Sequence, residues 1–390
     1  LAELERWGLA LRRREGGLPH VSAAPGHKTP RLTGCGDSTV REVTRVLEEQ
    51  AIKRGIQRNA DSIPLTIVSD NSQVRGVVTL DVPSGRIDAI QTKAIILATE
   101  GHQGLWSNPS DGPGTGSALA ISAGIDLKGM GITPRHPLTI RDCGIHIPLD
   151  VLGSGGRIRR ENGDDVGPEE ALEGENCVLD LRQMDADAKV WFSQTSMRIM
   201  DRLGIDISKD VIPLSPGVAY TTGGAPSDSQ GRVVFQGHTT EGLPAELWHT
   251  GLYAAGRSAH TGMHGSNALP GNLLLDDLVS GKAAGEHASK WATGIKFGGN
   301  TQIEEAVKGE SDRVSSIMEG DGMAVAKFHS KLASVISSGS SNEASLAEVR
   351  AIKDTGITLS DTSSVMNTEM AEALRLVGLA SVAEEILTSG

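Results

Sequence analysis

Two short apolar runs, each followed by a glycine-containing turn, constrain the fold of this chain most strongly. The first run covers residues 94–98 and breaks at Thr99-Glu100-Gly101, and the second covers residues 252–255 and breaks at Gly256. Apolar runs of this length are typical of strands in a parallel sheet. The carboxyl ends of such strands leave backbone N–H groups free for ligands. A plain strand-to-helix turn explains either break alone, whereas the two together favour a ligand-binding edge.

The composition excludes several classes of protein. A chain of 390 residues predicts two or three folding units. A net charge of −12 and 3% aromatic residues argue against a nucleic-acid-binding surface. Cys35, Cys143 and Cys177 are far apart and odd in number, which argues against a disulfide framework or a cysteine metal site and fits a reducing compartment. An apolar run of about 20 residues, which a membrane-spanning helix needs, is absent from the sequence.

The hydrophobic periodicity predicts an α/β order of elements. We expect helices over residues 38–54, 117–123, 184–203 and 273–291. We expect a three-stranded meander over residues 63–69, 74–81 and 86–90, and a further strand over 211–218. Residues 126–180 read as irregular, and the tail after about residue 293 reads as helical without strands.

Some smaller motifs are weak by themselves. Gly114-Thr115-Gly116 opens a predicted helix, and a helix N-terminus of this kind can hold a phosphate. It matches neither a Walker loop nor a complete G-x-G-x-x-G fingerprint. His260 and His264 are four residues apart but lack the glutamate of a zinc protease motif, so we expect no metal site.

The segment 251–276 resembles the flavoprotein subunits of succinate dehydrogenase and fumarate reductase. That family reads G-L-Y-A-x-G-E-x-A and then H-G-A-N-R-L-G-G-N-S-L-L-D. Five further segments resemble family motifs and follow the family's order. A-T-E-G at residues 98–101 resembles A-T-G-G, N-P-S-D and G-T-G within 108–116 resemble N-P-S-D and G-D-G, and H-P at 136–137 matches the family's H-P. P-G-V-A-Y-T-T-G-G at 216–224 resembles P-T-x-H-Y-x-M-G-G, and L-S-D-T-S-S-V-M-N-T-E at 359–369 resembles L-S-D-R-S-R-V-F-N-T-D. L-aspartate oxidase belongs to the same superfamily.

The resemblance implies an α/β fold in which a Rossmann-like FAD-binding domain is split by an inserted capping domain and followed by a C-terminal helical domain. The implied ranges are 1–133 and 213–292 for the FAD-binding domain, 134–212 for the capping domain and 293–390 for the helical domain. It implies FAD as the cofactor and His136 as a catalytic residue. The residues expected to contact FAD are Ala98, Thr99, Gly101, Gly114, Thr115, Gly116, Gly256, Arg257, Asn272, Leu273 and Leu274.

The implied reaction is hydride transfer between a small dicarboxylate and flavin N5. The implied partner is an iron–sulfur electron-transfer subunit, with no nucleic acid and no direct membrane insertion. The implied location is the cytoplasm, peripheral to the membrane through partner subunits. In this family a strand–glycine–helix segment that binds the FAD pyrophosphate precedes the first matching residues, so we expect the chain to be a fragment that does not retain FAD alone.

Apart from the first histidine, which matches His136, the family's substrate-binding and flavin-contacting side chains are largely replaced. The family's second histidine corresponds to Ala219, and the arginine of H-G-A-N-R corresponds to Ala268. A Thr-Glu pair corresponds to Pro148-Leu149, the acid of A-x-G-E to Arg257, and the aspartate of G-D-G to Thr115. The family's S-R-D segment is missing between about residues 166 and 176. Losing one buried charge partner costs about 2–5 kcal/mol. Two alternatives therefore stay open: an L-aspartate oxidase-like enzyme, and a degenerate, non-catalytic flavoprotein or scaffold.

Overall fold

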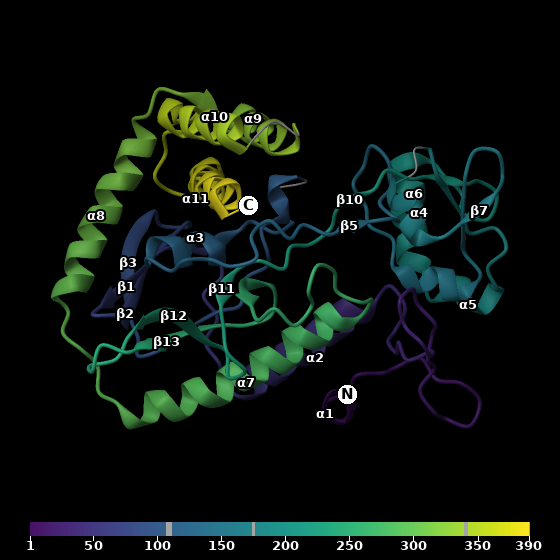
Figure 1. Ribbon diagram of the computed structural model, residues 1–390, viewed down its shortest axis with the longest axis horizontal. Coiled ribbons are helices and arrows are strands. Elements are labelled where there is room, and N and C mark those ends of the chain that lie inside the picture. Colours follow the sequence, from purple (N-terminus) through teal and green to yellow (C-terminus); the bar gives the residue numbers. More distant parts are fainter. Residues whose placement is uncertain (107–110, 174–175, 339–341, 390) are drawn as a thin grey trace. The chain divides into compact units, whose positions relative to one another are not determined.

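The computed structural model describes residues 1–106, 111–173, 176–338 and 342–389 (Figure 1). Its contacts divide the chain into two compact units. Unit 1 contains Leu1–Arg58, Arg135–Ala219 and Ala268–Leu274, and unit 2 contains Asn59–Pro134, Tyr220–Asn267 and Leu275–Gly390. The four domain ranges implied by the resemblance stay a prediction.

The predicted meander of unit 2 is confirmed. Strands β1 (Ser62–Asp70), β2 (Gln73–Asp81) and β3 (Arg86–Gln91) pair antiparallel in sequence order. Buried and half-buried residues alternate along β2, because successive side chains of a strand point to opposite faces. Helix α8 (Thr301–Met318) packs on this meander through Ile303 and Val314, which share a hydrophobic cluster with Val78 and Leu80.

The two apolar runs form strands, as predicted, and these strands pair parallel with each other. Strand β4 (Ile95–Leu97) lies parallel to β13 (Pro244–Ala254), and β13 also pairs antiparallel with β12 (Arg232–His238). The sequence missed β12 and the first half of β13, where polar residues interrupt the apolar pattern. Burial of β4 is incomplete, since Ile96 is 38% exposed.

The tail is helical, as predicted, and packs on the strands of the same unit. Helices α9 (Val325–Ser337), α10 (Asn342–Thr355) and α11 (Thr368–Ser389) share one hydrophobic cluster with α3 (Thr115–Ser122), β4 and β13. Leu119, Leu252, Phe328 and Leu379 are members of this cluster. The expectation of no strand in the tail is wrong, because β15 (Met323–Ala324) pairs with β16 (Ile357–Thr358).

Unit 1 is built from short elements, and here the sequence predictions were less accurate. The region expected to be irregular contains β6 (Arg157–Arg159), β7 (Asp165–Val166) and β8 (Val178–Asp180). These strands form a small sheet with β9 (Ile212–Pro213), in the order β7-β6-β8-β9. The expected strand over 211–218 is two separate strands, because Pro213 and Pro216 cannot donate backbone N–H groups to a continuous ladder. The expected helix over 184–203 is two helices that are interrupted at Trp191-Phe192.

The other elements of unit 1 are α1 (Ala2–Arg6), α2 (Thr39–Lys53), β5 (Arg135–His136), η2 (Leu149–Ser154), β6 (Arg157–Arg159), β7 (Asp165–Val166), α4 (Pro168–Glu173), β8 (Val178–Asp180), α5 (Ala186–Val190), α6 (Ser193–Leu203), β9 (Ile212–Pro213) and β10 (Gly217–Val218). Those of unit 2 are η1 (Gln103–Leu105), β11 (Ala225–Pro226), η3 (Gly256–Ser258) and β14 (Ala259–His260). Helix α7 (Asn272–Gly294) begins in the last segment of unit 1 and continues in unit 2.

Candidate functional site

The carboxyl ends of β4 and β13 meet at one edge of the sheet in unit 2. The N–H of Ala255 donates to the carbonyl of Leu97 at 2.9 Å and extends the parallel pairing by one residue. Immediately after the strands, the hydroxyl oxygens of Thr99 and Ser258 lie 3.0 Å apart, and Ser258 Oγ also donates to the Thr99 carbonyl. These contacts therefore connect the two predicted turns, which follow residues 98 and 255.

The start of α3 joins the same edge. The N–H of Gly116 donates to Thr99 Oγ1 at 3.0 Å, and the N–H of Gly114 donates to the Gly101 carbonyl at 3.0 Å. A Cβ atom at position 116 would lie 2.5 Å from Thr99 Oγ1, so this close approach requires glycine. The structure thus brings the segments 98–101 and 114–116 together with residues 256–258.

A charged cluster lies beside these turns. Arg257 Nη2 is 3.7 Å from Glu100 Oε1 and 3.6 Å from Asp277 Oδ2, and Asp277 lies on α7. Arg257 Nε is buried and has no hydrogen-bond partner among the described residues. Burial raises the pKa of Asp277, and the positive charge of Arg257 opposes that rise. The sequence did not single out Glu100 or Asp277 as functional residues.

The close packing at this cluster depends on Gly256. Its φ is +56°, and a Cβ atom there would lie 2.2 Å from Asp277 Oδ1. The N–H of Gly256 donates to Ser280 Oγ at 2.8 Å, which ties the end of β13 to α7. A glycine at this position therefore brings the strand end and the helix within contact distance.

His136 lies in unit 1, where β5 pairs with β10. The N–H of Leu138 donates to His136 Nδ1 at 3.2 Å, which places the ring proton on Nε2. Burial, with a smaller contribution from His146, lowers the pKa of His136 to about 3. At neutral pH this ring is therefore an uncharged hydrogen-bond donor through Nε2.

His146 is a neighbour of His136 that sequence reasoning missed. The two ring centroids are 5.5 Å apart. Thr139 Oγ1 donates to the His136 carbonyl at 2.9 Å, so the contact of 2.9 Å between Thr139 Oγ1 and His146 Nδ1 has the ring nitrogen as donor. Turns and irregular chain separate the two histidines, which are ten residues apart, so the sequence carried no periodic signal for this pair.

The histidines that are four residues apart in the sequence have separate partners. His260 Nδ1 lies 3.0 Å from the Thr222 carbonyl, and His264 Nε2 lies 3.2 Å from Asp276 Oδ2. In the part of the chain that the structure describes, no group of three or more histidine, cysteine or acidic side chains is arranged to hold a metal ion.

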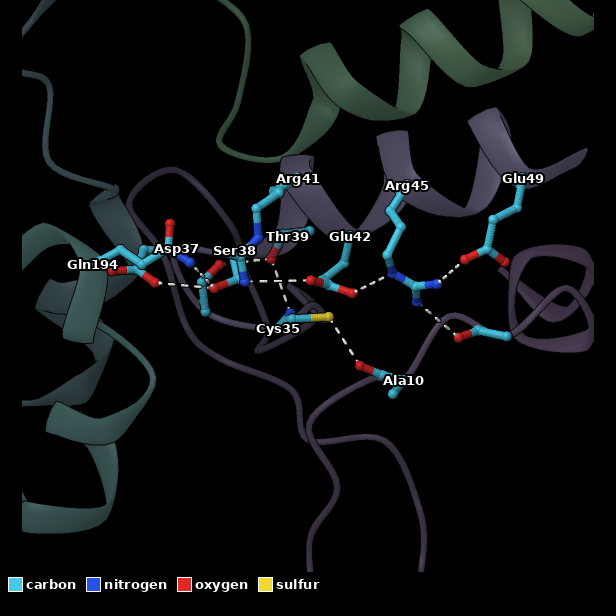
Figure 2. A network of polar contacts seen from close by, with 12 residues as sticks. Ala10, Cys35, Asp37, Ser38, Thr39, Arg41, Glu42, Arg45, Glu49 and Gln194 are labelled. Carbon is cyan, nitrogen blue, oxygen red and sulfur yellow. Dashed lines mark hydrogen bonds and ion pairs between the residues drawn. The ribbon is translucent and has the colours of Figure 1, made fainter. Parts of the chain in front are cut away.

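A polar network in unit 1 links the N-terminal segment to α2 and α6 (Figure 2). The N–H of Thr195 donates to Asp37 Oδ2 at 2.7 Å, and the side-chain amide of Gln194 lies 2.7 Å from Ser38 Oγ. Cys35 Sγ donates to the Ala10 carbonyl, and burial raises the pKa of this thiol. This network positions the chain, and its cysteine is a poor nucleophile because the thiolate is disfavoured.

The remaining predicted site residues lie elsewhere. Asn272, Leu273 and Leu274 form the first turn of α7 and belong to unit 1. The start of the N-P-S-D motif, at 108–110, lies outside the described residues. Within the described residues, each helix is too short or too polar to cross a membrane.

Comparison with known proteins agrees with this architecture. The family described as FAD binding domain matches residues 1–274. The fumarate reductase flavoprotein subunit of Escherichia coli is 25% identical over 98% of this chain and 70% of its own length. The succinate dehydrogenase flavoprotein subunit of Rickettsia bellii is 25% identical over 97% of this chain and 71% of its own length. A mutant of E. coli quinol fumarate reductase superposes with a TM-score of 0.88 at 23% identity, over 99% of this chain and 73% of that one.

The chain belongs to the FAD binding domain family. Within it, the chain is an FAD-binding oxidoreductase of the fumarate reductase and succinate dehydrogenase flavoprotein type, so the predicted relationship, the α/β fold and FAD as cofactor are confirmed. It spans 56–74% of the length of four relatives named as fumarate reductase flavoprotein subunits.

The residues at the edge of unit 2 fit such a cofactor. An open carboxyl edge of parallel strands is the usual place for a dinucleotide in α/β folds. The unpartnered N–H of Arg257 needs an acceptor, and Glu100 offers a carboxylate beside it. The Arg257 guanidinium suits a phosphate or a hydroxyl group of FAD, and the Glu100 carboxylate suits a hydroxyl group.

Proposed function

We propose that this chain is the flavin-binding part of an oxidoreductase that acts on a small dicarboxylate, with succinate or fumarate as the first candidates. The observation that carries the proposal is the convergence of residues 98–101, 114–116 and 256–258 at one sheet edge in a member of an FAD-binding family. FAD would accept or donate the hydride when bound. This chain would hold it through Thr99, Gly116 and Arg257.

In this proposal His136 contributes to binding of the dicarboxylate. Its Nε2–H can donate one hydrogen bond to a carboxylate, and the contact from Leu138 holds the ring in the tautomer that does so. Because the ring is neutral, it adds little charge stabilisation. The dicarboxylate therefore needs other cations, which the family carries where this chain has Ala219 and Ala268.

The replaced residues favour one second candidate, a flavoprotein that binds FAD without oxidising a dicarboxylate. Pro148 precedes η2 and Leu149 is its first residue, at the two positions where the family has a threonine and a glutamate. Neither side chain can hydrogen-bond a carboxylate. L-aspartate oxidase-like chemistry is less favoured, because it uses the same lost residues.

One partner subunit follows from the proposed redox role. Several relatives are named as subunits of larger reductases, which supports an electron-accepting partner subunit for this chain as well. We propose that this partner carries iron–sulfur clusters and that the assembly lies at the cytoplasmic face of a membrane.

The experiment that separates the candidates has two stages. The purified chain is titrated with FAD, and binding is followed by flavin fluorescence and the visible spectrum. Succinate-dependent dye reduction and fumarate-dependent reoxidation are then measured at equal flavin content. Binding with turnover supports the enzyme, and binding without turnover supports the non-catalytic flavoprotein. Loss of weakly bound FAD on dialysis contradicts neither candidate, whereas failure to bind at flavin concentrations up to about 1 mM, a weak-binding limit, contradicts both.

A further inference from the structure

Four ring side chains of unit 2 form a cluster between β13 and α7, which we call the ring cluster. Trp248 and Tyr253 come from β13, and His287 and Trp291 come from α7. The ring centroid of Trp248 lies 5.6 Å from those of Tyr253 and His287 and 4.9 Å from that of Trp291. Tyr253 is fully buried, whereas the other three side chains are half-buried. Edge-to-face contacts explain how these rings pack, but not how their polar atoms are paired.

Among the three oxidisable rings of the cluster, one has a base as its hydrogen-bond partner. Tyr253 Oη lies 2.8 Å from His287 Nδ1, and a neutral imidazole nitrogen accepts a phenol proton. Trp248 Nε1 donates to the Leu252 carbonyl at 3.1 Å, and a carbonyl oxygen is not a base at neutral pH. Trp291 Nε1 is buried and has no hydrogen-bond partner among the described residues. A ring that loses an electron can therefore pass its proton to a neighbouring base only at Tyr253.

Burial makes this base decisive for the oxidation of Tyr253. Burial raises the pKa of Tyr253 to about 12, so the ring is a neutral phenol at neutral pH. Removing an electron alone would leave a positive charge on a fully buried ring, and an unpaired buried charge is costly. Transfer of the phenol proton to His287 places that charge on a half-buried imidazole instead. Tyr253 is therefore the ring of the cluster at which an oxidised state is best stabilised.

We propose that Tyr253 and His287 form a proton-coupled redox pair that traps one-electron oxidants, with Trp248 and Trp291 as the relay. An oxidant of the inorganic-radical class takes one electron from a half-buried tryptophan and leaves as its anion. Tyr253 returns one electron to the tryptophan, and its phenol proton moves to His287 Nδ1. A neutral tyrosyl radical and an imidazolium remain. This function is separate from hydride transfer and does not depend on the proposed flavin binding.

The test uses azide radicals, which are generated by pulse radiolysis in a solution of the full chain. These radicals oxidise accessible tryptophans, and transient absorption distinguishes tryptophan radicals from tyrosyl radicals. Decay of the first signal with matching growth of the second measures the electron transfer. A rate that does not change with protein concentration shows that the transfer occurs within one chain.

The sequence supplies a matched control, because Tyr220 is the other of its two tyrosines. The Tyr220 hydroxyl donates to the side-chain oxygen of Asn267 in the same unit, and a carboxamide is not a base. The variants are Tyr253→Phe, His287→Gln, Trp248→Phe and the control Tyr220→Phe. His287→Gln keeps a hydrogen-bond acceptor for the phenol but removes the base, so it separates proton transfer from packing. Melting temperatures show whether each variant is folded.

We expect transfer within one chain in the wild type and in Tyr220→Phe, and no such transfer in Tyr253→Phe. His287→Gln should slow it about a hundredfold, the size of effect that a positioned base contributes. Trp248→Phe should also slow it, and the wild-type rate should be lower in D2O because a proton moves with the electron. The proposal is overturned if Tyr220→Phe abolishes the transfer, if His287→Gln or Trp248→Phe leaves its rate unchanged, or if D2O has no effect. Because His287→Gln alone decides whether the base matters, the test holds even if Tyr253→Phe does not fold.

Discussion

At the scale of single residues, His136 is held as a neutral donor by its surroundings. Burial lowers its pKa to about 3, and Leu138 fixes its tautomer. The unfolded chain takes up a proton near pH 6.5, while the folded chain does so only near pH 3. Stability of unit 1 should therefore fall as the pH decreases between these values.

The variant His136→Asn tests this linkage, because its side-chain oxygen can replace Nδ1 as the acceptor. Between pH 6.5 and 4, each decrease of one pH unit should lower the free energy of unfolding of the wild type by about 1.4 kcal/mol more than that of the variant. Chemical denaturation at a series of pH values measures the difference. The exposed His238→Asn is the control, and parallel pH profiles for wild type and His136→Asn would contradict the expectation.

At the scale of elements, a chain of alternating charges runs across the small sheet of unit 1. Arg157 and Arg159 contact Asp165, and Arg159 and Arg182 contact Asp180. Hydrogen bonds from Arg182 lower the pKa of Asp180 to about 2. The side chain of Asp180 is 2% exposed and that of Asp165 is 51% exposed, so the two carboxylates differ mainly in burial.

This difference predicts unequal costs for the same substitution. Asp180→Asn should reduce the free energy of unfolding by about 2 kcal/mol, because it removes the charge of a buried carboxylate that both Arg159 and Arg182 contact. Asp165→Asn should cost less than about 1 kcal/mol, as exposed ion pairs do. Urea unfolding at pH 7 measures both. Because the pKa of Asp180 is lower in the folded chain than in the unfolded chain, its contribution to the free energy of unfolding is present above about pH 4 and is lost as the pH falls towards 2. Equal costs of the two substitutions at pH 7 would be inconsistent with this explanation.

Helix α11 begins with a side-chain cap that organises the loop before it. Asn367 Oδ1 accepts the N–H of Met370 at 2.7 Å, and Asn367 Nδ2 donates to the carbonyls of Asp361 and Ser363. Asn367→Ala should lower stability by about 2 kcal/mol through loss of the cap and of these loop contacts. Asn367→Asp keeps the acceptor and should cost less. Thermal unfolding compares them with Thr388→Ala at the exposed end of α11, and an Asn367→Ala variant as stable as this control would contradict the role of Asn367.

At the scale of the whole molecule, activity is expected to be limited by missing cations. The double variant Ala219→His with Ala268→Arg restores the residue types that the family carries. Each regained charge-assisted hydrogen bond could accelerate succinate oxidation tens- to hundreds-fold. Dye reduction at equal flavin content measures the gain, with Ala219→Phe and Ala268→Leu as an uncharged control. A wild type that already oxidises succinate faster than the double variant would show that the lost residues do not limit this protein.

The sequence alone determined the parts of this protein that depend on local pattern. The meander, the helices of the tail and the strands formed by the two apolar runs follow from periodicity and from glycine turns that end the strands. Collinear motifs also identified the family and its cofactor. These features could be predicted because each depends on a short stretch of consecutive residues.

Tertiary structure alone decided which distant groups meet. Glu100, Arg257 and Asp277 come from three separate segments, and their contacts arise only when β4 and β13 pair and α7 packs against them. His146 lies beside His136 because an irregular loop returns to β5. Such a loop has no hydrophobic periodicity from which this contact could be predicted. Sequence patterns specify which face of an element is buried, whereas the side chains that face one another across elements depend on how those elements pack.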